Sequence, residues 1–263
     1  MALIRCEFFS DVLGMSTSMH VILPQQTSAQ IGMAGAATTG DHPTLYLLHG
    51  LSDDDSAWPR RTSIERYVAP LGLAVVMPVV HRSFYRDEAH GHRYWTFLSE
   101  ELPQVCHSFF HLSDRREDTF VAGLSMGGYG ALNWALRRPE RFAAAASLSG
   151  VVDLPATGAR YDDGVDPDLW DRVFGGPPAG RRDTEDDLRW LLGQAVAAGV
   201  DLPALYVGCG TEDRLFAQNE RFVELARRLD VTVAVDFGPG EHEWGLWDRM
   251  IQDVLAWLPL RSG

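Results

Sequence analysis

The stretch that decides the fold is Asp118-Thr119-Phe120-Val121-Ala122-Gly123-Leu124-Ser125-Met126-Gly127-Gly128-Tyr129-Gly130. Phe120 to Ala122 is a short apolar run that predicts a buried strand, and Ala131 to Arg138 predicts a helix that ends before a proline. Between them stands Gly-x-Ser-x-Gly, at Gly123, Ser125 and Gly127. Such a strand, tight turn and helix hold a serine in a strained backbone conformation with its hydroxyl above the sheet.

Two other interpretations of this glycine-rich turn are weaker. A tightly packed turn without chemistry needs the same small residues, but here both flanks are those that a nucleophile elbow requires. A phosphate-binding loop would continue from Gly128 with Lys and Ser or Thr, whereas this chain has Tyr129 and Gly130. The turn therefore predicts a nucleophilic Ser125.

The composition favours one acidic domain. At 263 residues the chain is near the upper limit for a single domain, and we expect one, spanning 1–263. Its 36 acidic and 23 basic residues give a net charge of −13, which argues against nucleic acid or an anionic membrane surface as a partner. The chain has no lysine, which excludes a Ser-Lys dyad, a Schiff base and a Walker lysine.

The cysteines and the N-terminal residues bear on the compartment. Cys6, Cys106 and Cys209 are an odd number of scattered cysteines, which predicts buried free thiols in a reducing compartment. Arg5 and Glu7 interrupt what would be the apolar core of a signal peptide. No apolar run reaches the roughly 18 residues of a membrane span. We therefore expect a cytoplasmic protein without a membrane span.

Strands and helices alternate along most of the chain. Buried strands are predicted at 44–48, 73–78, 120–122, 143–148, 205–208 and 231–235, and helices at 63–69, 96–110, 131–138, 215–229 and 245–258. This alternation predicts an α/β fold with a mostly parallel central sheet and helices on both faces. Leu3 to Phe9 and Ser18 to Leu23 predict an antiparallel pair at a sheet edge.

Two further segments carry specific expectations. The helix 96–110 should place four apolar residues on one face: Leu98, Leu102, Val105 and Phe109. The segment 151–200 is rich in Asp, Gly, Pro and Arg, with a few isolated large apolar residues. We interpret it as a small cap-like insertion over the active site, at the carboxyl edge of the sheet.

A nucleophilic serine needs a base that takes its proton and a third group that orients the base. In α/β-hydrolases the chain order is Ser, then Asp or Glu, then His, with the last two after late strands. The strand 205–208 runs into Glu212 and Asp213, and the last strand runs into His242. These positions predict the triad Ser125, Asp213 and His242. Glu212 is the alternative acid, and its other interpretation is a surface or helix-capping residue.

An acyl-transfer site also needs N–H donors for the oxyanion. The residue after the nucleophile supplies one, which is Met126, and the loop after the strand 44–48 supplies the other, for which we choose Leu51. No metal centre is expected. His242-Glu243 lacks the second histidine of a zinc protease, and the pair His90 and His92 lacks companion ligands.

Further stretches support the same interpretation over nearly the whole chain. They are Glu7-Phe8-Phe9-Ser10 through Val21-Ile22-Leu23-Pro24, Leu45 to Gly50 with Trp58 downstream, Val76-Met77-Pro78, Glu100-Glu101-Leu102-Pro103, Ala122 to Gly130, Cys209-Gly210 to Asp213, and His242-Glu243-Trp244. Together they resemble the esterase D and antigen 85 branch of the α/β-hydrolases, and most closely the bacterial tributyrin-esterase type.

The resemblance implies a serine carboxylesterase without a cofactor, which hydrolyses short-chain acyl esters of small molecules through an acyl-enzyme. It implies the same triad and the same oxyanion donors. S-formylglutathione hydrolases and acetyl or feruloyl carbohydrate esterases resemble it too, so a thioesterase, a carbohydrate esterase or an acyltransferase is the alternative. A non-catalytic binding protein is disfavoured, since all three residue types of a triad are present.

Specificity is less defined. Candidate substrate contacts are His49, Trp170, Phe174 and Trp244. Trp170 and Phe174, with Trp190, either line an acyl pocket or only hold the segment 151–200 against the rest of the domain. The acidic run 53–55 either faces the site, where it would disfavour substrates that carry a carboxylate, or is a solvated loop. Homo-oligomerisation is left open.

Overall fold

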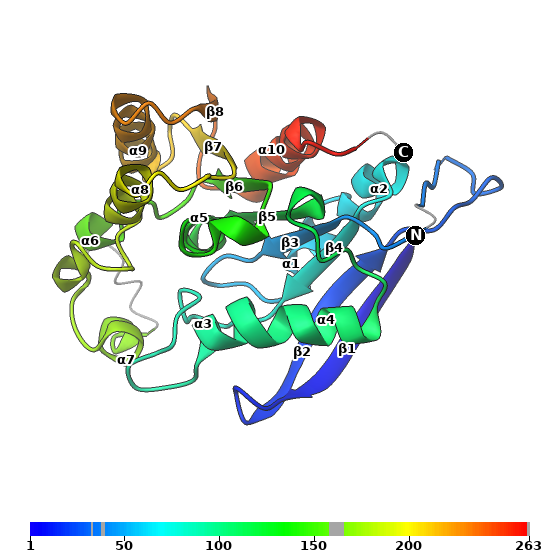
Figure 1. Ribbon diagram of the computed structural model, residues 1–263, viewed down its shortest axis with the longest axis horizontal. Helices are drawn as coiled ribbons and strands as arrows, with labels where there is room; N and C mark the ends of the chain where they lie inside the picture. The colour runs from blue at the N-terminus through cyan, green and yellow to red at the C-terminus, as the bar shows by residue number, and fades with distance from the viewer. Residues whose placement is uncertain (33, 38–39, 158–165, 262–263) are drawn as a thin grey trace.

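A computed structural model of the protein describes residues 1–32, 34–37, 40–157 and 166–261. Its centre is an eight-stranded sheet in the order β1-β2-β4-β3-β5-β6-β7-β8 (Figure 1). The strands are β1 (Ala2–Ser10), β2 (Met15–Leu23), β3 (Thr44–Leu48), β4 (Ala74–Pro78), β5 (Thr119–Leu124), β6 (Ala144–Leu148), β7 (Ala204–Gly210) and β8 (Val233–Gly238). β3 to β8 are parallel, and β1 and β2 form the predicted antiparallel pair at one edge.

Helices cover both faces of the sheet, which confirms the predicted fold class. They are α1 (Ala57–Arg61), α2 (Ile64–Val68), α3 (Tyr94–Thr96), α4 (Leu102–Phe109), α5 (Met126–Arg137), α6 (Leu154–Thr157), α7 (Leu169–Phe174), α8 (Leu188–Ala197), α9 (Phe216–Arg228) and α10 (Trp244–Trp257). Side chains of α4, α5, α8 and α9 pack in the core on one face, and those of α1, α2 and α10 pack on the other.

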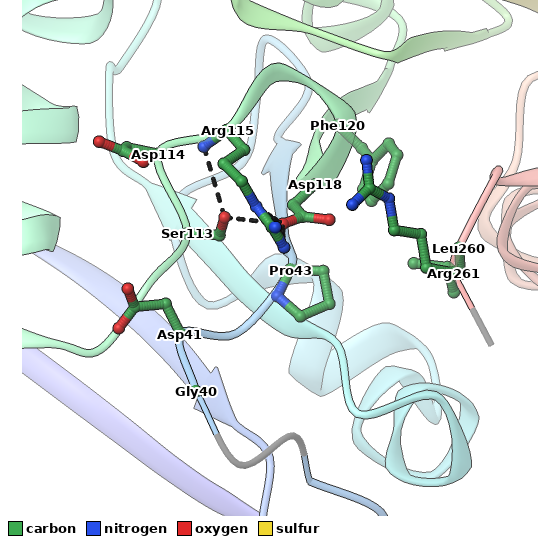
Figure 2. A pocket seen from close by; sticks show the side chains of 10 residues that line it. All are labelled: Gly40, Asp41, Pro43, Ser113, Asp114, Arg115, Asp118, Phe120, Leu260 and Arg261. Atoms are coloured by element: carbon green, nitrogen blue, oxygen red, sulfur yellow. Dashed lines mark hydrogen bonds and ion pairs between the residues drawn. The ribbon is translucent and has the colours of Figure 1, made fainter. Parts of the chain in front are cut away.

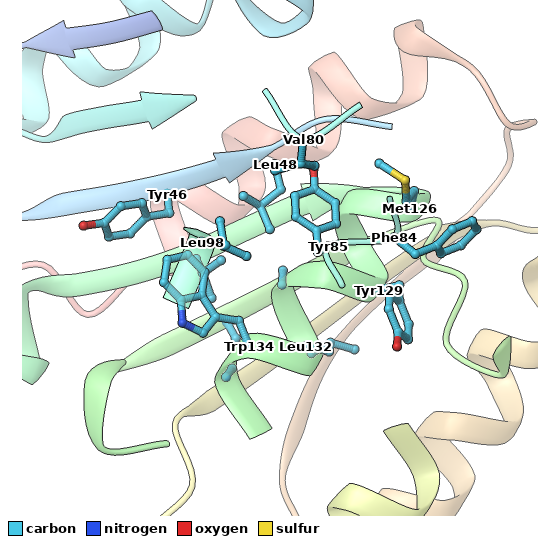
Figure 3. Packing of buried hydrophobic residues seen from close by; sticks show 14 of the residues in the cluster. Tyr46, Leu48, Val80, Phe84, Tyr85, Leu98, Met126, Tyr129, Leu132 and Trp134 are labelled. Atoms are coloured by element: carbon cyan, nitrogen blue, oxygen red, sulfur yellow. The ribbon is translucent and has the colours of Figure 1, made fainter. Parts of the chain in front are cut away.

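Apolar strands fix this arrangement. Every residue of β3, β4, β5 and β6 is buried, as expected for parallel strands that are covered on both sides. On the α5 side, Tyr46 of β3 meets Trp134 edge-on, with ring centroids 5.1 Å apart (Figure 3). Trp134 in turn meets Phe142 at 5.0 Å. These aromatic contacts fix α5, the helix that follows Ser125, against the sheet.

The predicted helix 96–110 is interrupted. A π-helical turn, Phe97–Glu101, lies between α3 and α4. Leu98 and Leu102 are buried as predicted, and Val105 is half-buried and packs against the core. Phe109, in the last turn of α4, is 54% exposed, and its ring meets Phe8 of β1 edge-on. The apolar face is therefore buried only up to the last turn of the helix, and Phe109 lies outside the core.

The segment 151–200 contains α6, α7 and α8, and its residues 158–165 lie outside the described part of the chain. The described part packs on α5, where Tyr129 and Asn133 donate side-chain hydrogen bonds to the carbonyls of Asp186 and Glu185. The single-domain organisation and the cap-like role of this segment stay predictions.

Of the three free cysteines, Cys106 and Cys209 are buried and Cys6 is half-buried. Burial raises the pKa of the Cys209 thiol to about 12, so this group is protonated at neutral pH. Among the described residues, no helix is both long enough and apolar enough to cross a membrane.

Candidate active site

Three segments that follow parallel strands meet at the carboxyl ends of these strands. Ser125 follows β5, Asp213 follows β7 and His242 follows β8. The hydroxyl of Ser125 lies 3.0 Å from Nε2 of His242, and Nδ1 of His242 lies 2.8 Å from Oδ2 of Asp213. The structure thus brings together the three residues predicted as a triad, because carboxyl ends of parallel strands share one edge.

The turn at Ser125 has the predicted strain. Its φ is 54° and its ψ is −116°, outside the regions that side chains with a Cβ prefer. The turn also brings helix and strand backbones very close. A Cβ on Gly127 would lie 2.5 Å from the carbonyl oxygen of Leu48 and 2.7 Å from that of His49. Only glycine fits there, and α5 begins at Met126, directly after the serine and earlier than predicted.

Asp213 is held as an ionised acceptor. Its side chain is fully buried, and Oδ1 accepts the N–H of Leu215 at 2.8 Å. Burial alone would raise the pKa of this carboxyl, but the hydrogen bond and charge of His242 outweigh burial and hold the pKa below its usual value. Glu212, the alternative acid, is exposed and accepts the N–H of Gly240 at 2.6 Å. It therefore steadies the turn before His242 and does not contact the imidazole.

Two residues beside the triad escaped the sequence analysis. Ser149 ends the segment after β6, is fully buried and has a φ of 48°. Its hydroxyl accepts the indole N–H of Trp247 at 3.1 Å, and it helps to lower the pKa of the Asp213 carboxyl. The Trp247 ring also stands edge-on to His242, with centroids 4.9 Å apart. A serine at a strand end and a tryptophan in an amphipathic helix are common, so neither gave a signal.

The predicted oxyanion donors lie on backbone segments that adjoin the nucleophile. Met126 is the first residue of α5, so its N–H has no partner one turn earlier in the helix. Gly50, which precedes Leu51, is close to Ser125, because a Cβ added to it would lie 3.8 Å from Cβ of Ser125. The carbonyl of His49 accepts the hydroxyl of Tyr85 at 2.8 Å, which fixes this loop. The assignment of Leu51 and Met126 as donors stays a prediction.

His49 is a structural residue, and its expected contact with substrate does not fit its surroundings. It is 1% exposed, and both ring nitrogens bond to backbone. Nε2 accepts the N–H of Val80 at 3.1 Å, so Nδ1 carries the proton and donates to the carbonyl of Gly50 at 2.7 Å. Burial lowers the pKa of this imidazole to about 4. No ring nitrogen is left for a substrate.

The aromatic residues proposed as substrate contacts pack mainly against other rings. Trp170 and Phe174 of α7 form a cluster with Phe84, with centroids 5.5 to 5.7 Å apart. Phe174 is only 2% exposed, which favours a role in holding the segment 151–200 against the rest of the domain. Trp244 meets Trp58 and Trp247 edge-on at 5.3 Å. Trp170 and Trp244 are half-buried, so their contact with substrate stays a prediction.

The acidic run 53–55 contains three different environments. Asp54 is exposed and accepts the N–H of Ser56. Asp55 is buried and accepts hydrogen bonds from the hydroxyl of Ser18 and the ring of His20. Asp53 lies beside Gly50 in the loop after β3, since a Cβ on Gly50 would lie 3.1 Å from its Oδ2. Burial raises the pKa of Asp53.

A separate cavity of about 520 Å³ lies at the opposite end of the parallel strands, where β3 and β5 begin (Figure 2). Two of its charged groups, Arg115 and Asp118, pair with each other. Arg115 donates Nε–H to Asp118 at 2.7 Å, and Ser113 donates its hydroxyl to the same carboxylate at 2.8 Å. We assign this cavity no part in the chemistry at Ser125.

Comparison with known proteins agrees with this geometry. Residues 10–258 match the family described as "Putative esterase". The chain is 26% identical over 269 residues to an acetyl esterase of Caldicellulosiruptor saccharolyticus, in an alignment that covers 98% of each protein. Two solved structures from Staphylococcus aureus are each 35% identical to it. A fluorophosphonate-binding serine hydrolase F aligns with a TM-score of 0.88 over 99% of each chain. An S-formylglutathione hydrolase aligns with a TM-score of 0.85 over 98% of each chain.

The fold and these relatives define a serine hydrolase of the α/β-hydrolase class. The chain belongs to the esterase family that it matches, and it is an enzyme that acts on carboxylic esters. This excludes the non-catalytic binding protein. Mycobacterial antigen 85 acyltransferases align with part of the chain, which confirms the predicted branch. The tributyrin-esterase subtype stays a prediction.

Proposed function

We propose that the protein hydrolyses short-chain acyl esters through an acyl-enzyme on Ser125. His242 acts as the general base and Asp213 orients it. The observation that carries the proposal is the pair of hydrogen-bond distances, 3.0 Å from Ser125 to His242 and 2.8 Å from His242 to Asp213. No cofactor is needed for this chemistry, since the nucleophile, the base and the oxyanion donors all come from the chain.

The tautomer of His242 follows from its partners. Asp213 is ionised and accepts the N–H of Nδ1, which leaves Nε2 as the acceptor for the Ser125 hydroxyl. Ser125 attacks the ester carbonyl as Nε2 takes its proton. The N–H groups of Leu51 and Met126 bind the oxyanion, and the imidazolium then protonates the leaving alkoxide. Water, deprotonated by His242, hydrolyses the acyl-enzyme by the same steps.

The test is a series of p-nitrophenyl esters from acetyl to dodecanoyl. We expect rapid turnover of the short chains only, and a loss of at least about 10³-fold in kcat for Ser125→Ala. Ser147→Ala is the matched control. Ser147 is a buried serine on the neighbouring strand, and its hydroxyl has no hydrogen-bond partner among the described residues. Full activity of folded Ser125→Ala would refute the role of Ser125.

A thioesterase activity is the second candidate. The relative from Staphylococcus aureus with 35% identity over 98% of the chain is an S-formylglutathione hydrolase. The same acyl-enzyme would form, with a thiolate as the leaving group. Comparison of kcat/KM for S-formylglutathione and for p-nitrophenyl acetate decides between them, because only a thioesterase should prefer the thioester. An added alcohol acceptor tests for acyl transfer, which would yield the transesterified product.

A further inference from the structure

The strand β1 ends the sheet, and within the described part of the chain it pairs only with β2 (Figure 1). Its free peptide groups follow from the register. The N–H of Val79 donates to the carbonyl of Ser18. The backbone N–H and C=O groups of the even-numbered β2 residues therefore point to β4, and those of the odd-numbered β2 residues point to β1. Odd residues of β2 pair with even residues of β1, as Met19 does with Cys6. The backbone N–H and C=O groups of the odd β1 residues therefore point to the open edge.

The odd side chains of β1 form an exposed row. They are Leu3, Arg5, Glu7 and Phe9. Leu3 is 46% exposed and Phe9 is 62% exposed. The even residues Cys6 and Phe8 instead pack on the main core. The row thus has apolar ends and a central pair of opposite charges.

This row is complementary to itself. If a second β1 runs antiparallel with Cys6 opposite Cys6, Leu3 faces Phe9 of the second copy, and Arg5 faces Glu7 of the second copy. Each of the four odd residues then exchanges two backbone hydrogen bonds with its opposite residue. Apolar pairs and opposite charges directly across an antiparallel pair are the favourable combinations. A shift by two residues would place Arg5 opposite Arg5 or Glu7 opposite Glu7.

We propose that β1 pairs antiparallel with β1 of a second copy about a two-fold axis at Cys6, so that the two sheets become one. Edge strands are protected from pairing by Pro, by bulges or by charged side chains. β1, with the sequence ALIRCEFFS, has no Pro, and its two charged residues, Arg5 and Glu7, are of opposite sign. Six large apolar residues are exposed in the described part of the chain, and Leu3, Phe9 and Phe109 lie at this edge. Phe109 belongs there because its ring meets Phe8 edge-on at 6.4 Å.

A charge-reversal cycle tests the pairing. Sedimentation velocity over a wide concentration range should show a dimer for the unmodified protein. Glu7→Arg places like charges opposite each other twice, so it should weaken dimerisation at least about tenfold. The double variant Arg5→Glu/Glu7→Arg exchanges the two signs and should restore it. Glu224→Arg, an equal charge change on the exposed side of α9, is the control and should leave the dimer intact.

Cys6 reports on the register. Opposed Cys6 residues would form a non-hydrogen-bonded pair with Cα atoms about 4.5 Å apart, within reach of a disulfide. Diamide, which takes up the two thiol hydrogens, should therefore link two chains through Cys6. Cys6→Ser should abolish the link, while the buried Cys106 and Cys209 remain in both proteins.

A monomer at every concentration would overturn the proposal, and so would a dimer that ignores Glu7→Arg. A dimer without the Cys6 link would exclude the two-fold axis at Cys6. Esterase activity and thermal unfolding of each variant check that it is folded. The proposal is independent of the roles assigned to Ser125, Asp213 and His242, because β1 carries none of them.

Discussion

Trp247 donates its indole N–H to the hydroxyl of Ser149 at 3.1 Å, and that hydroxyl helps to lower the pKa of the Asp213 carboxyl. Because the indole N–H occupies a lone pair of this oxygen, the single hydroxyl hydrogen of Ser149 remains available for the carboxylate. Through this chain of contacts, a helix at the end of the sequence fixes the orientation of the acid that in turn orients His242. We regard Ser149 as a positioning residue.

The first prediction concerns Ser149→Ala. The hydroxyl of Ser149 helps to lower the pKa of Asp213. Its loss should raise the pKa of Asp213, so activity should be lost at a higher pH on the acid side of the kcat/KM profile. We expect kcat to fall about tenfold with little change in KM. Trp247→Phe should shift the profile in the same direction. An unchanged profile in a folded Ser149→Ala variant would argue against the positioning role.

A second prediction separates the two candidate acids. Asp213→Asn should lower kcat by about 10³- to 10⁴-fold, since an amide N–H facing Nδ1 favours the wrong tautomer of His242. Glu212→Gln keeps an oxygen for the N–H of Gly240 and should change kcat by less than about threefold. The measurement is kcat with p-nitrophenyl acetate at neutral pH. Equal losses in the two variants would contradict the assignment of Asp213.

The sequence was sufficient to predict the strands and the residues that follow them. In a parallel sheet, position after a strand determines which residues meet, so Ser125, Asp213 and His242 could be placed together without knowledge of the helices. Contacts between side chains distant in sequence could not be predicted this way. The bond between Trp247 and Ser149 joins residues 98 positions apart. Likewise, nothing in the sequence around His49 indicates that the backbone N–H of Val80 donates to the imidazole of His49.

Local irregularity was equally hidden from the sequence. The π-helical turn at Phe97–Glu101 interrupts a segment whose apolar spacing suits an uninterrupted helix. Three consecutive aspartates at 53–55 are chemically identical in the sequence. Only Asp55 is buried, and its hydrogen-bond partners, Ser18 and His20, lie on β2, far from it in the sequence.

A third prediction concerns the close approach of helix and strand at Gly127. A Cβ there would meet two backbone carbonyl oxygens, which cannot rotate away as a side chain would. We expect Gly127→Ala to lower the free energy of unfolding by about 2 kcal/mol or more, and to reduce kcat by displacing the loop that carries Leu51. The control is Gly193→Ala within α8, where a Cβ meets nothing within 4 Å. It should be neutral or stabilise by up to about 1 kcal/mol. Urea unfolding of both variants measures the difference, and similar stabilities would refute the steric argument.

A fourth prediction concerns the charge of the acyl group. Asp53 lies beside the loop that adjoins Ser125, so an anionic acyl group should be repelled there. We expect a higher kcat/KM for butyryl than for succinyl esters. Asp53→Asn should reduce the ratio of the butyryl to the succinyl kcat/KM by about threefold to tenfold. Asp54→Asn removes the same charge from an exposed neighbour and should have a smaller effect. A preference for succinyl esters in the unmodified enzyme would contradict the role of Asp53.

The fifth prediction follows from the buried imidazole of His49, whose pKa falls from 6.5 to about 4 on folding. Above about pH 6.5 the ring is neutral in both states, and this group adds no pH dependence. As the pH falls towards 4, the unfolded chain takes up a proton that the folded protein excludes, so the free energy of unfolding decreases. The free energy of unfolding falls by about 3 kcal/mol in all through this group, and the decrease ends once His49 is also protonated in the folded protein.

His49→Gln should remove this dependence while keeping a donor for Gly50 and an acceptor for Val80. Urea unfolding at several pH values between about 7 and 4.5 gives the slope for each protein. The unmodified protein should lose about 2 to 3 kcal/mol more than the variant over this range, whatever the cost of the substitution at neutral pH. Carboxylates and His42, whose pKa is also lowered, contribute alike to both proteins and cancel in the difference. Parallel curves would mean that His49 accepts a proton in the folded protein as easily as in the unfolded chain, and its bonds to Gly50 and Val80 would then not hold it neutral.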